Sequence, residues 1–253
     1  MKIIENKPLT EFSKLPIQVQ STKKVDLTKS ELPPNEQEEL LKKLFQEIGK
    51  LKDSGKIILA QSSGSESYVM ARIIPSKAKN NPLVFTEPNP VTIYYNCAIA
   101  HIETSLELQA KIINNSWSPI DLYNEFISFF SESFQGITQL LMSLEALFNQ
   151  LIPDDIELNL NGKNLTKKDI EWQKFKEKYR YILPEISGIN LFEDYNDDYQ
   201  NIITLNDIRN DLIHLKSIRK ENFTYYQALF KTLIDLDYKR FSNSVHKIIT
   251  ILQ

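Results

Sequence analysis

Cysteine, histidine and glycine are all scarce in this sequence. Its 253 residues include 6 glycines, one cysteine, Cys97, and three histidines, His101, His214 and His246. One cysteine excludes a disulfide within the chain and a structural zinc site built from cysteines. Because the histidines show no metal-ligand spacing, we expect neither a metal nor another cofactor. So few glycines argue against a glycine-rich phosphate loop and against an all-β fold with many tight turns.

Long apolar runs are also missing. No stretch approaches the roughly 18 apolar residues that would span a bilayer, and the first eight residues lack the apolar segment of a signal peptide. We therefore expect a cytoplasmic protein with no membrane-bound part.

Neither sign of charge dominates the chain. Apolar residues make up 42% of it, charged residues 25%, and the net charge is −3. These values are ordinary for a globular protein. Because the chain as a whole is not basic, any site for nucleic acid must be local rather than a broad electrostatic surface.

The first part of the chain, residues 1–115, has patterns of both helix and strand. Asn35 with Glu38 three residues later is typical of a helix start, and apolar residues then recur at helical spacing up to about residue 51. Residues 56–61 and 68–74 are predicted to be strands of a hairpin joined by a serine- and glycine-rich loop.

The end of this first part is predicted to contain one more strand and a helix. Residues 91–95 are the strand candidate, following Pro88 and Pro90, and residues 97–113 are the helix. We place the boundary with the second part between residues 114 and 118. The first part contains no motif that indicates a function.

The second part, residues 118–253, is predicted to be a bundle of about four helices. Four hydroxyl residues have an acidic or amide residue three places later, which is typical of helix starts: Ser118, Thr166, Thr204 and Thr224. The first helix keeps one apolar stripe up to Pro153, and a last helix carries leucines and isoleucines from residue 229 to 252. The acidic run 193–198 is interpreted as a solvated loop. The predicted fold class is therefore α+β, a small mixed α/β part followed by an all-α bundle.

Three residues of the predicted third helix suggest chemistry. Asn210 and His214 are four apart and share a helix face, while Arg209 lies about 140° around the helix from His214. An arginine that bends, or a second protomer, would bring the guanidinium to the histidine. The alternative without a function is a surface arginine and a half-buried helix histidine, because an arginine and a histidine five residues apart are common in helical proteins.

These residue types suit metal-independent cleavage of RNA. Histidine can exchange a proton near neutral pH, arginine stays charged and matches phosphate oxygens, and asparagine can orient an imidazole. In RNA the 2′-hydroxyl lies beside the scissile phosphate, so a base and a cation suffice to start and stabilise the reaction. DNA lacks that hydroxyl, so we expect no action on DNA.

The surrounding sequence resembles a known signature. Residues 205–214, LNDIRNDLIH, resemble the motif of the HEPN superfamily, in which an arginine, often followed by asparagine or aspartate, precedes a histidine by four to six intervening residues. Residues 143–153 are similar to the helix that precedes this motif in many bacterial members, with Glu145 and Asn149 four apart on one face. The resemblance covers about residues 118–253.

This resemblance implies a helical domain that forms a homodimer, with a composite site where the motifs of two protomers meet. Many members are ribonuclease toxins or effectors in antiphage defence and toxin–antitoxin systems, so RNA is the implied substrate and an inhibitor or sensor protein a possible partner. Arg209 and His214 would be catalytic, Asn210 would hold the site in place, and the supporting candidates are Glu145, Asn149 and Asp211. The alternative is a HEPN-like domain without activity that serves for dimerisation or binding.

The sequence departs from some toxins of this family just after the motif. Those toxins carry a tyrosine two residues after the histidine, where it is modified by a partner nucleotidyltransferase, but this chain has Lys216. Lys216, Arg219 and Lys220 are instead candidates for contact with the RNA backbone, the alternative being a solvated helix end.

Overall fold

The computed structural model separates the chain into two compact units. Residues 1–5 and 90–253 form the helical unit, and residues 6–89 form the second unit. The described positions are residues 1–5, 58–61, 68–74, 83–86, 88–114, 118–160, 162–214 and 224–253. The division falls between Asn89 and Pro90, so it differs from the boundary that the sequence placed at residues 114–118.

The second unit contains a three-stranded antiparallel sheet. Its strands are β1 (Ile58–Gln61), β2 (Tyr68–Ile74) and β3 (Leu83–Thr86), in the order β1-β2-β3. Ile58 pairs with Ala71, and Ala71 pairs on its other side with Thr86. The pairing of the first two strands confirms the predicted antiparallel pair, whereas β3 was not predicted. The helix predicted from Asn35, and the loop predicted to join β1 and β2, lie outside the described residues.

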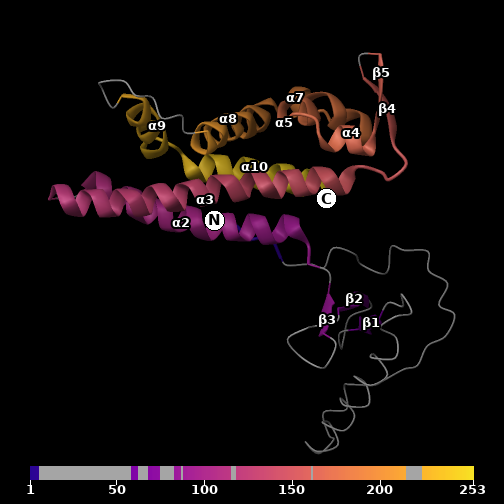
Figure 1. Cartoon of the computed structure of the whole chain (residues 1–253), viewed down its shortest axis with the longest axis horizontal. Coiled ribbons are helices and arrows are strands. Elements are labelled where there is room, and N and C mark those ends of the chain that lie inside the picture. The colour runs from indigo at the N-terminus through magenta and orange to yellow at the C-terminus, as the bar shows by residue number, and fades with distance from the viewer. Residues whose placement is uncertain are drawn as a thin grey trace, which may run out of the picture. The chain divides into compact units, whose positions relative to one another are not determined.

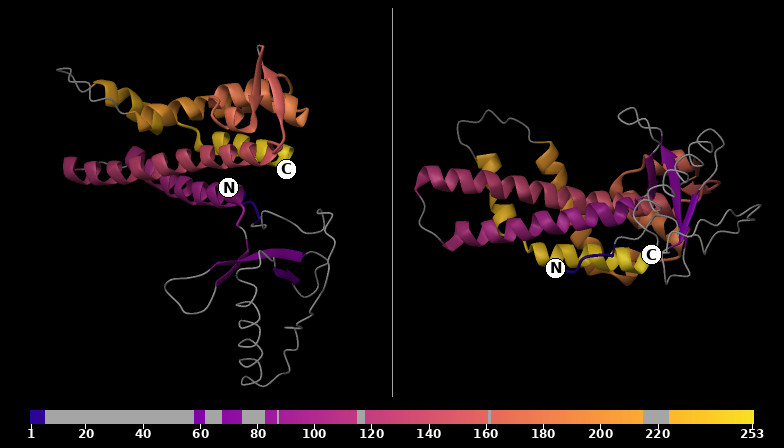
Figure 2. Two further views of the ribbon diagram at one scale, coloured as in Figure 1. Left: turned by 45° about the vertical axis from the view of Figure 1, so that its right-hand side comes forward. Right: turned by 90° about the horizontal axis from the view of Figure 1, so that it is seen from below.

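The helical unit is built around two long neighbouring helices, α2 and α3, which run side by side in opposite directions (Figures 1 and 2). Its helices are α2 (Pro90–Asn114), α3 (Pro119–Leu151), α4 (Lys167–Glu171), α5 (Phe175–Glu177), the π-helix η2 (Lys178–Ile182), α6 (Leu183–Ser187), α7 (Leu191–Asp194), α8 (Asn196–Ile213), α9 (Thr224–Ile234) and α10 (Tyr238–Leu252). None of these helices, in the part of the chain that the structure describes, is long and apolar enough to cross a membrane.

Close packing joins α2 to α3. A side chain on Gly136 of α3 would place its Cβ 2.7 Å from Cγ1 of Ile102 on α2, so only glycine fits without a shift. The strand predicted over residues 91–95 is wrong: Pro90 opens α2, a position that proline tolerates, and Val91 and Tyr95 are buried four residues apart on one helix face. The helix predicted over residues 97–113 is confirmed as the rest of α2.

The start of α3 matches its prediction. Ser118 is the N-cap, and its side chain accepts a hydrogen bond from the backbone N–H of Asp121. The long apolar stripe runs along α3 into the core, where its buried members include Ile137, Leu141 and Leu144.

A small hairpin that the sequence did not predict follows α3. Strand β4 (Glu157–Leu160) pairs with β5 (Lys163–Thr166), and Gly162 in the turn has a φ of 77°, a conformation that favours glycine. The predicted helix start at Thr166 is confirmed. Thr166 and Asp169 form a capping box, in which the carboxylate of Asp169 accepts the N–H of Thr166 at 2.9 Å.

The acidic run 193–198 is helical rather than a loop. It spans the end of α7 and the start of α8, where Asp197 and Asp198 occupy the first turn and suit the positive end of the helix dipole. The helix start predicted at Thr204 is therefore wrong. Thr204 lies inside α8 and its hydroxyl donates to the carbonyl of Gln200 at 2.9 Å.

The single last helix predicted from the leucine pattern is in fact two helices. It is interrupted after α9, and Asp237 caps α10 by accepting the N–H of Arg240 at 3.0 Å. Helix α10 packs against α2, α3 and α8 and so closes the core of the helical unit (Figure 2). The structure is thus mostly helical with small sheets, consistent with the predicted α+β class.

Candidate active site

The guanidinium of Arg209 is held by two asparagines of its own helix. Nη2 of Arg209 donates to Oδ1 of Asn206 at 2.9 Å and to Oδ1 of Asn210 at 3.2 Å. Asn206 is buried with 4% of its surface exposed, whereas Arg209 and Asn210 are half-buried. The arginine therefore lies along α8 toward the face that carries Asn210, which is also the face of His214.

Both partners of this arginine are neutral. Arginine stays protonated in proteins, and an amide oxygen accepts a hydrogen bond without cancelling the positive charge. Nε of Arg209 is buried and has no hydrogen-bond partner among the described residues.

His214 ends helix α8. It is the C-cap residue, its backbone N–H donates to the carbonyl of Asn210 at 2.9 Å, and its side chain is exposed. An exposed imidazole is accessible to a large substrate such as RNA. Within one chain, the structure brings Arg209 and Asn210 into contact and places His214 one turn further along. No hydrogen bond between the side chains of Arg209 and His214 occurs among the described contacts.

Asn210 takes a different partner from the one expected. Asparagine was expected to orient the imidazole, but Oδ1 of Asn210 accepts from Arg209 instead. The neighbouring Asp211 is exposed on α8. Asp207, one turn earlier, forms an ion pair with Lys176 of α5 at 3.0 Å, which neutralises that carboxylate beside the motif.

Glu145 belongs to a separate cluster. Its carboxylate lies 2.9 Å from Nζ of Lys178, whose side chain is 5% exposed and lies over the ring of Phe148. Burial, and next the charge of Glu145, raise the pKa of Tyr179 well above its usual value. Asn149 is exposed one turn further along α3.

The two clusters are separate but near one another, because Lys176 of α5 pairs with Asp207 of α8 at 3.0 Å and Lys178, two residues later, pairs with Glu145 of α3 at 2.9 Å. The C-terminal end of α3, near Glu145 and Asn149, leads to the β4–β5 hairpin, whereas the C-terminal end of α8 lies near α9 (Figure 1). Among the described contacts, no hydrogen bond or ion pair joins Glu145 or Asn149 to Arg209 or His214. The basic candidates after the motif, Lys216, Arg219 and Lys220, lie outside the described residues.

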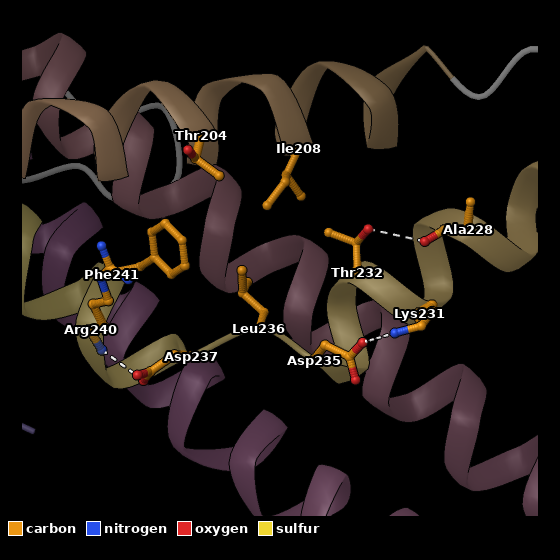
Figure 3. A pocket seen from close by; sticks show the side chains of 10 residues that line it. All are labelled: Thr204, Ile208, Ala228, Lys231, Thr232, Asp235, Leu236, Asp237, Arg240 and Phe241. Carbon is orange, nitrogen blue, oxygen red and sulfur yellow. Dashed lines mark hydrogen bonds and ion pairs between the residues drawn. The ribbon is translucent and has the colours of Figure 1, made fainter. Parts of the chain in front are cut away.

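A pocket of about 500 Å³ lies between α8, α9 and α10 (Figure 3). Thr204 and Ile208 line its α8 side, and at about 100° per residue Asn206 and Asn210 lie on the opposite side of the helix. Several polar groups that line the pocket pair with one another: Lys231 forms an ion pair with Asp235, and the hydroxyl of Thr232 donates to the carbonyl of Ala228. The pocket is thus separate from the arginine cluster.

Asn206 is the site residue that sequence reasoning missed. Its signal was present, since it precedes Arg209 by three residues, the spacing at which helix side chains meet.

Among the described residues, no three histidine, cysteine, aspartate or glutamate side chains gather in a way that could hold a metal ion. No protein-family model, curated protein or solved structure matches this chain.

Proposed function

We propose that this protein is a metal-independent endoribonuclease of HEPN type that acts on RNA in the cytoplasm, in antiphage defence or in a toxin–antitoxin system. One observation carries the proposal. Arg209 is fixed by the neutral side chains of Asn206 and Asn210 on the helix face that ends at the exposed His214. Cleavage at a 2′-hydroxyl requires a cation for the phosphoryl oxygens and an accessible base, and among the described contacts Arg209 has no carboxylate partner.

In the proposed reaction, His214 accepts the proton of the RNA 2′-hydroxyl. The 2′-oxygen attacks the adjacent phosphorus, the bond from phosphorus to the 5′-oxygen breaks, and the leaving oxygen takes up a proton from an imidazolium. Arg209 donates to the non-bridging oxygens, whose negative charge grows in the transition state. The products are a 2′,3′-cyclic phosphate and a 5′-hydroxyl.

A homodimer is part of this proposal. The motif of each chain offers one histidine for two proton transfers, and no side-chain hydrogen bond joins Arg209 to His214 among the described contacts of one chain. A second copy that faces the same helix end would supply the second histidine and complete the site. Light scattering on the purified protein tests this: we expect a dimer, and a monomer at high concentration would contradict the composite site.

Expression in bacteria tests the nuclease itself. We expect the wild type to stop growth and to fragment cellular RNA, and the matched variant His214→Ala to do neither. The exposed position of His214 at the helix end means that this change should leave the fold intact. Equal growth of both strains with intact RNA would reject the nuclease.

The second candidate function is a HEPN-like binding module without activity. It is favoured by exposed apolar residues at the start of α3, where Ile120 is 71% and Tyr123 62% exposed, because clusters of exposed apolar side chains often mark protein contacts. Intact RNA in a wild type that still forms a dimer would support this function.

A further inference from the structure

We propose that Asn206 is a positioning residue for Arg209, an inference that rests on the nuclease proposed above. Asn206 would act through the arginine and would not touch RNA. It fixes the direction of the guanidinium, so that the arginine is already oriented when the phosphate binds.

The burial of Asn206 supports this role. Asn206 is 4% exposed and follows the buried Leu205 on α8. An apolar residue would stabilise such a position better, because placing an amide away from water is unfavourable unless it is hydrogen-bonded. Among the described contacts, the hydrogen bond of the Asn206 side chain is the one that it accepts from Nη2 of Arg209 at 2.9 Å.

The geometry of the two bonds leaves donors for a phosphate. Asn206 and Asn210 both bind Nη2, and no described residue forms a hydrogen bond with Nη1 of Arg209. Guanidinium donors form a planar fork, so fixing one nitrogen fixes the direction of the other. The asparagine pair therefore sets the angle at which Nη1 faces a ligand.

The choice of an amide over a carboxylate also has a physical reason. Aspartate at position 206 would hold Arg209 as well as asparagine does, but as a buried ion pair it would neutralise much of the charge that the phosphate needs. Substitution by aspartate thus separates the position of the guanidinium from its charge, whereas substitution by leucine or serine removes the contact.

Asn201 offers a matched control on the same helix. It is 6% exposed, close to the value for Asn206, but its Nδ2 donates to Oγ of Ser244 at 2.8 Å and has no contact with the arginine. Replacing either asparagine by leucine removes one side-chain hydrogen bond of a buried residue of α8. Only the change at position 206 should affect Arg209.

The first measurement uses NMR of the full chain to follow rotation about the Nε–Cζ bond of Arg209. We expect slow rotation in the wild type, in Asn201→Leu and in Asn206→Asp, and at least tenfold faster rotation in Asn206→Leu. Asn206→Ser serves as a second variant should the leucine variant not fold. Rotation in the wild type as fast as in the leucine or serine variant would overturn the proposal.

The second measurement is single-turnover cleavage of a transcript that the wild type cuts. We expect Asn206→Leu to cleave about tenfold to a hundredfold more slowly, since small errors of placement have effects of this size. Asn206→Asp should also cleave more slowly, because its carboxylate neutralises much of the charge of a guanidinium that stays in place. KM should change little, and Asn201→Leu should cleave at the wild-type rate. A leucine variant with a freed arginine and an unchanged rate would overturn the positioning role.

The two readouts separate this inference from the nuclease on which it rests. If the wild type cuts no RNA, the nuclease is rejected, and the NMR rotation rates alone decide whether Asn206 fixes Arg209. If the wild type cuts RNA and Asn206→Leu does so equally fast, the nuclease stands and the positioning role is rejected.

Discussion

Two cations are held inside the helical unit in opposite ways. The side chain of Lys178 on η2 is 5% exposed and pairs with the carboxylate of Glu145 at 2.9 Å. Arg209 on α8 is held by the amide oxygens of Asn206 and Asn210. The first cation is neutralised by its partner, whereas the second keeps its charge.

This difference indicates which cation serves the fold and which can serve a ligand. A buried ion pair whose charges cancel offers little field to an approaching anion, and Lys178 is further covered by the ring of Phe148. A guanidinium bound by neutral groups attracts a phosphate with its full charge. Arg209 is therefore the better candidate for chemistry, even though both residues are fixed in place.

The largest expected effect comes from removing the uncompensated cation. Arg209→Ala should slow RNA cleavage about a hundredfold to a thousandfold, the range for losing one donor that stabilises a developing oxyanion. It should also lower the free energy of unfolding by about 1–3 kcal/mol, because it leaves the carbonyl oxygen of the buried Asn206 side chain without its donor.

Arg180 provides the control for that change. It is an exposed arginine of the same unit, which lies 4.4 Å over the ring of Phe192. Arg180→Ala should leave the cleavage rate unchanged. The measurement is the initial rate at which each variant cleaves one transcript. An equal fall of this rate in Arg209→Ala and Arg180→Ala would mean that only general positive charge is required.

Breaking the neutralised pair should affect stability instead. Glu145→Ala leaves the buried Lys178 without its partner, so we expect the free energy of unfolding to fall by about 3 kcal/mol. Urea denaturation followed by circular dichroism measures this loss. Under conditions where the variant is folded, it should cleave RNA at the wild-type rate. A slower rate would indicate that Glu145 has a role in the active site.

Replacing both members of the pair should have a smaller effect than replacing one. Apolar residues of similar volume often substitute for a buried ion pair without loss. We expect Glu145→Leu combined with Lys178→Met to unfold within about 1 kcal/mol of the wild type. If the double variant is as unstable as Glu145→Ala, the ion pair contributes more to the free energy of unfolding than the neutralisation of its two charges.

The smallest expected effect is a pH dependence of stability that involves neither cation. Burial, and next the charge of Lys2, lower the pKa of His246 below its ordinary value near 6.5. Below pH 6.5 the unfolded chain therefore binds more protons at this residue than the folded chain does. Its stabilising contribution is complete above that pH and is lost as the pH falls through the folded pKa.

Thermal unfolding between pH 7 and pH 5 measures this contribution. His246→Gln should show a shallower fall of Tm toward pH 5 than the wild type does. Parallel curves for the two proteins would show that His246 does not titrate with folding.

The sequence predicted elements well where one local signal decided the structure. The N-cap at Ser118 and the apolar stripe that follows it predicted α3, and Thr166 with Asp169 predicted the start of α4. Prediction failed where two signals competed. The β-branched and aromatic residues 91–95 favoured a strand, but Pro90 and the packing of α2 on α3 made them helical.

The candidate site was only partly accessible to the same reasoning. Spacing placed Asn210 and His214 on one face, and the reach of arginine allowed Arg209 to approach it. Glu145 was assigned by resemblance, and its true partner, Lys178, comes from a segment 33 positions later that no local pattern connects to it. Asn206 was missed because its burial follows from tertiary packing.

The most direct test of the proposed chemistry is the identity of the RNA ends that the purified protein creates in the presence of a metal chelator. Cleavage by His214 and Arg209 predicts new 3′-ends that carry a 2′,3′-cyclic phosphate and new 5′-ends that carry a hydroxyl, both absent with His214→Ala. RNA that stays intact, or new ends with a 3′-hydroxyl and a 5′-phosphate, would contradict it.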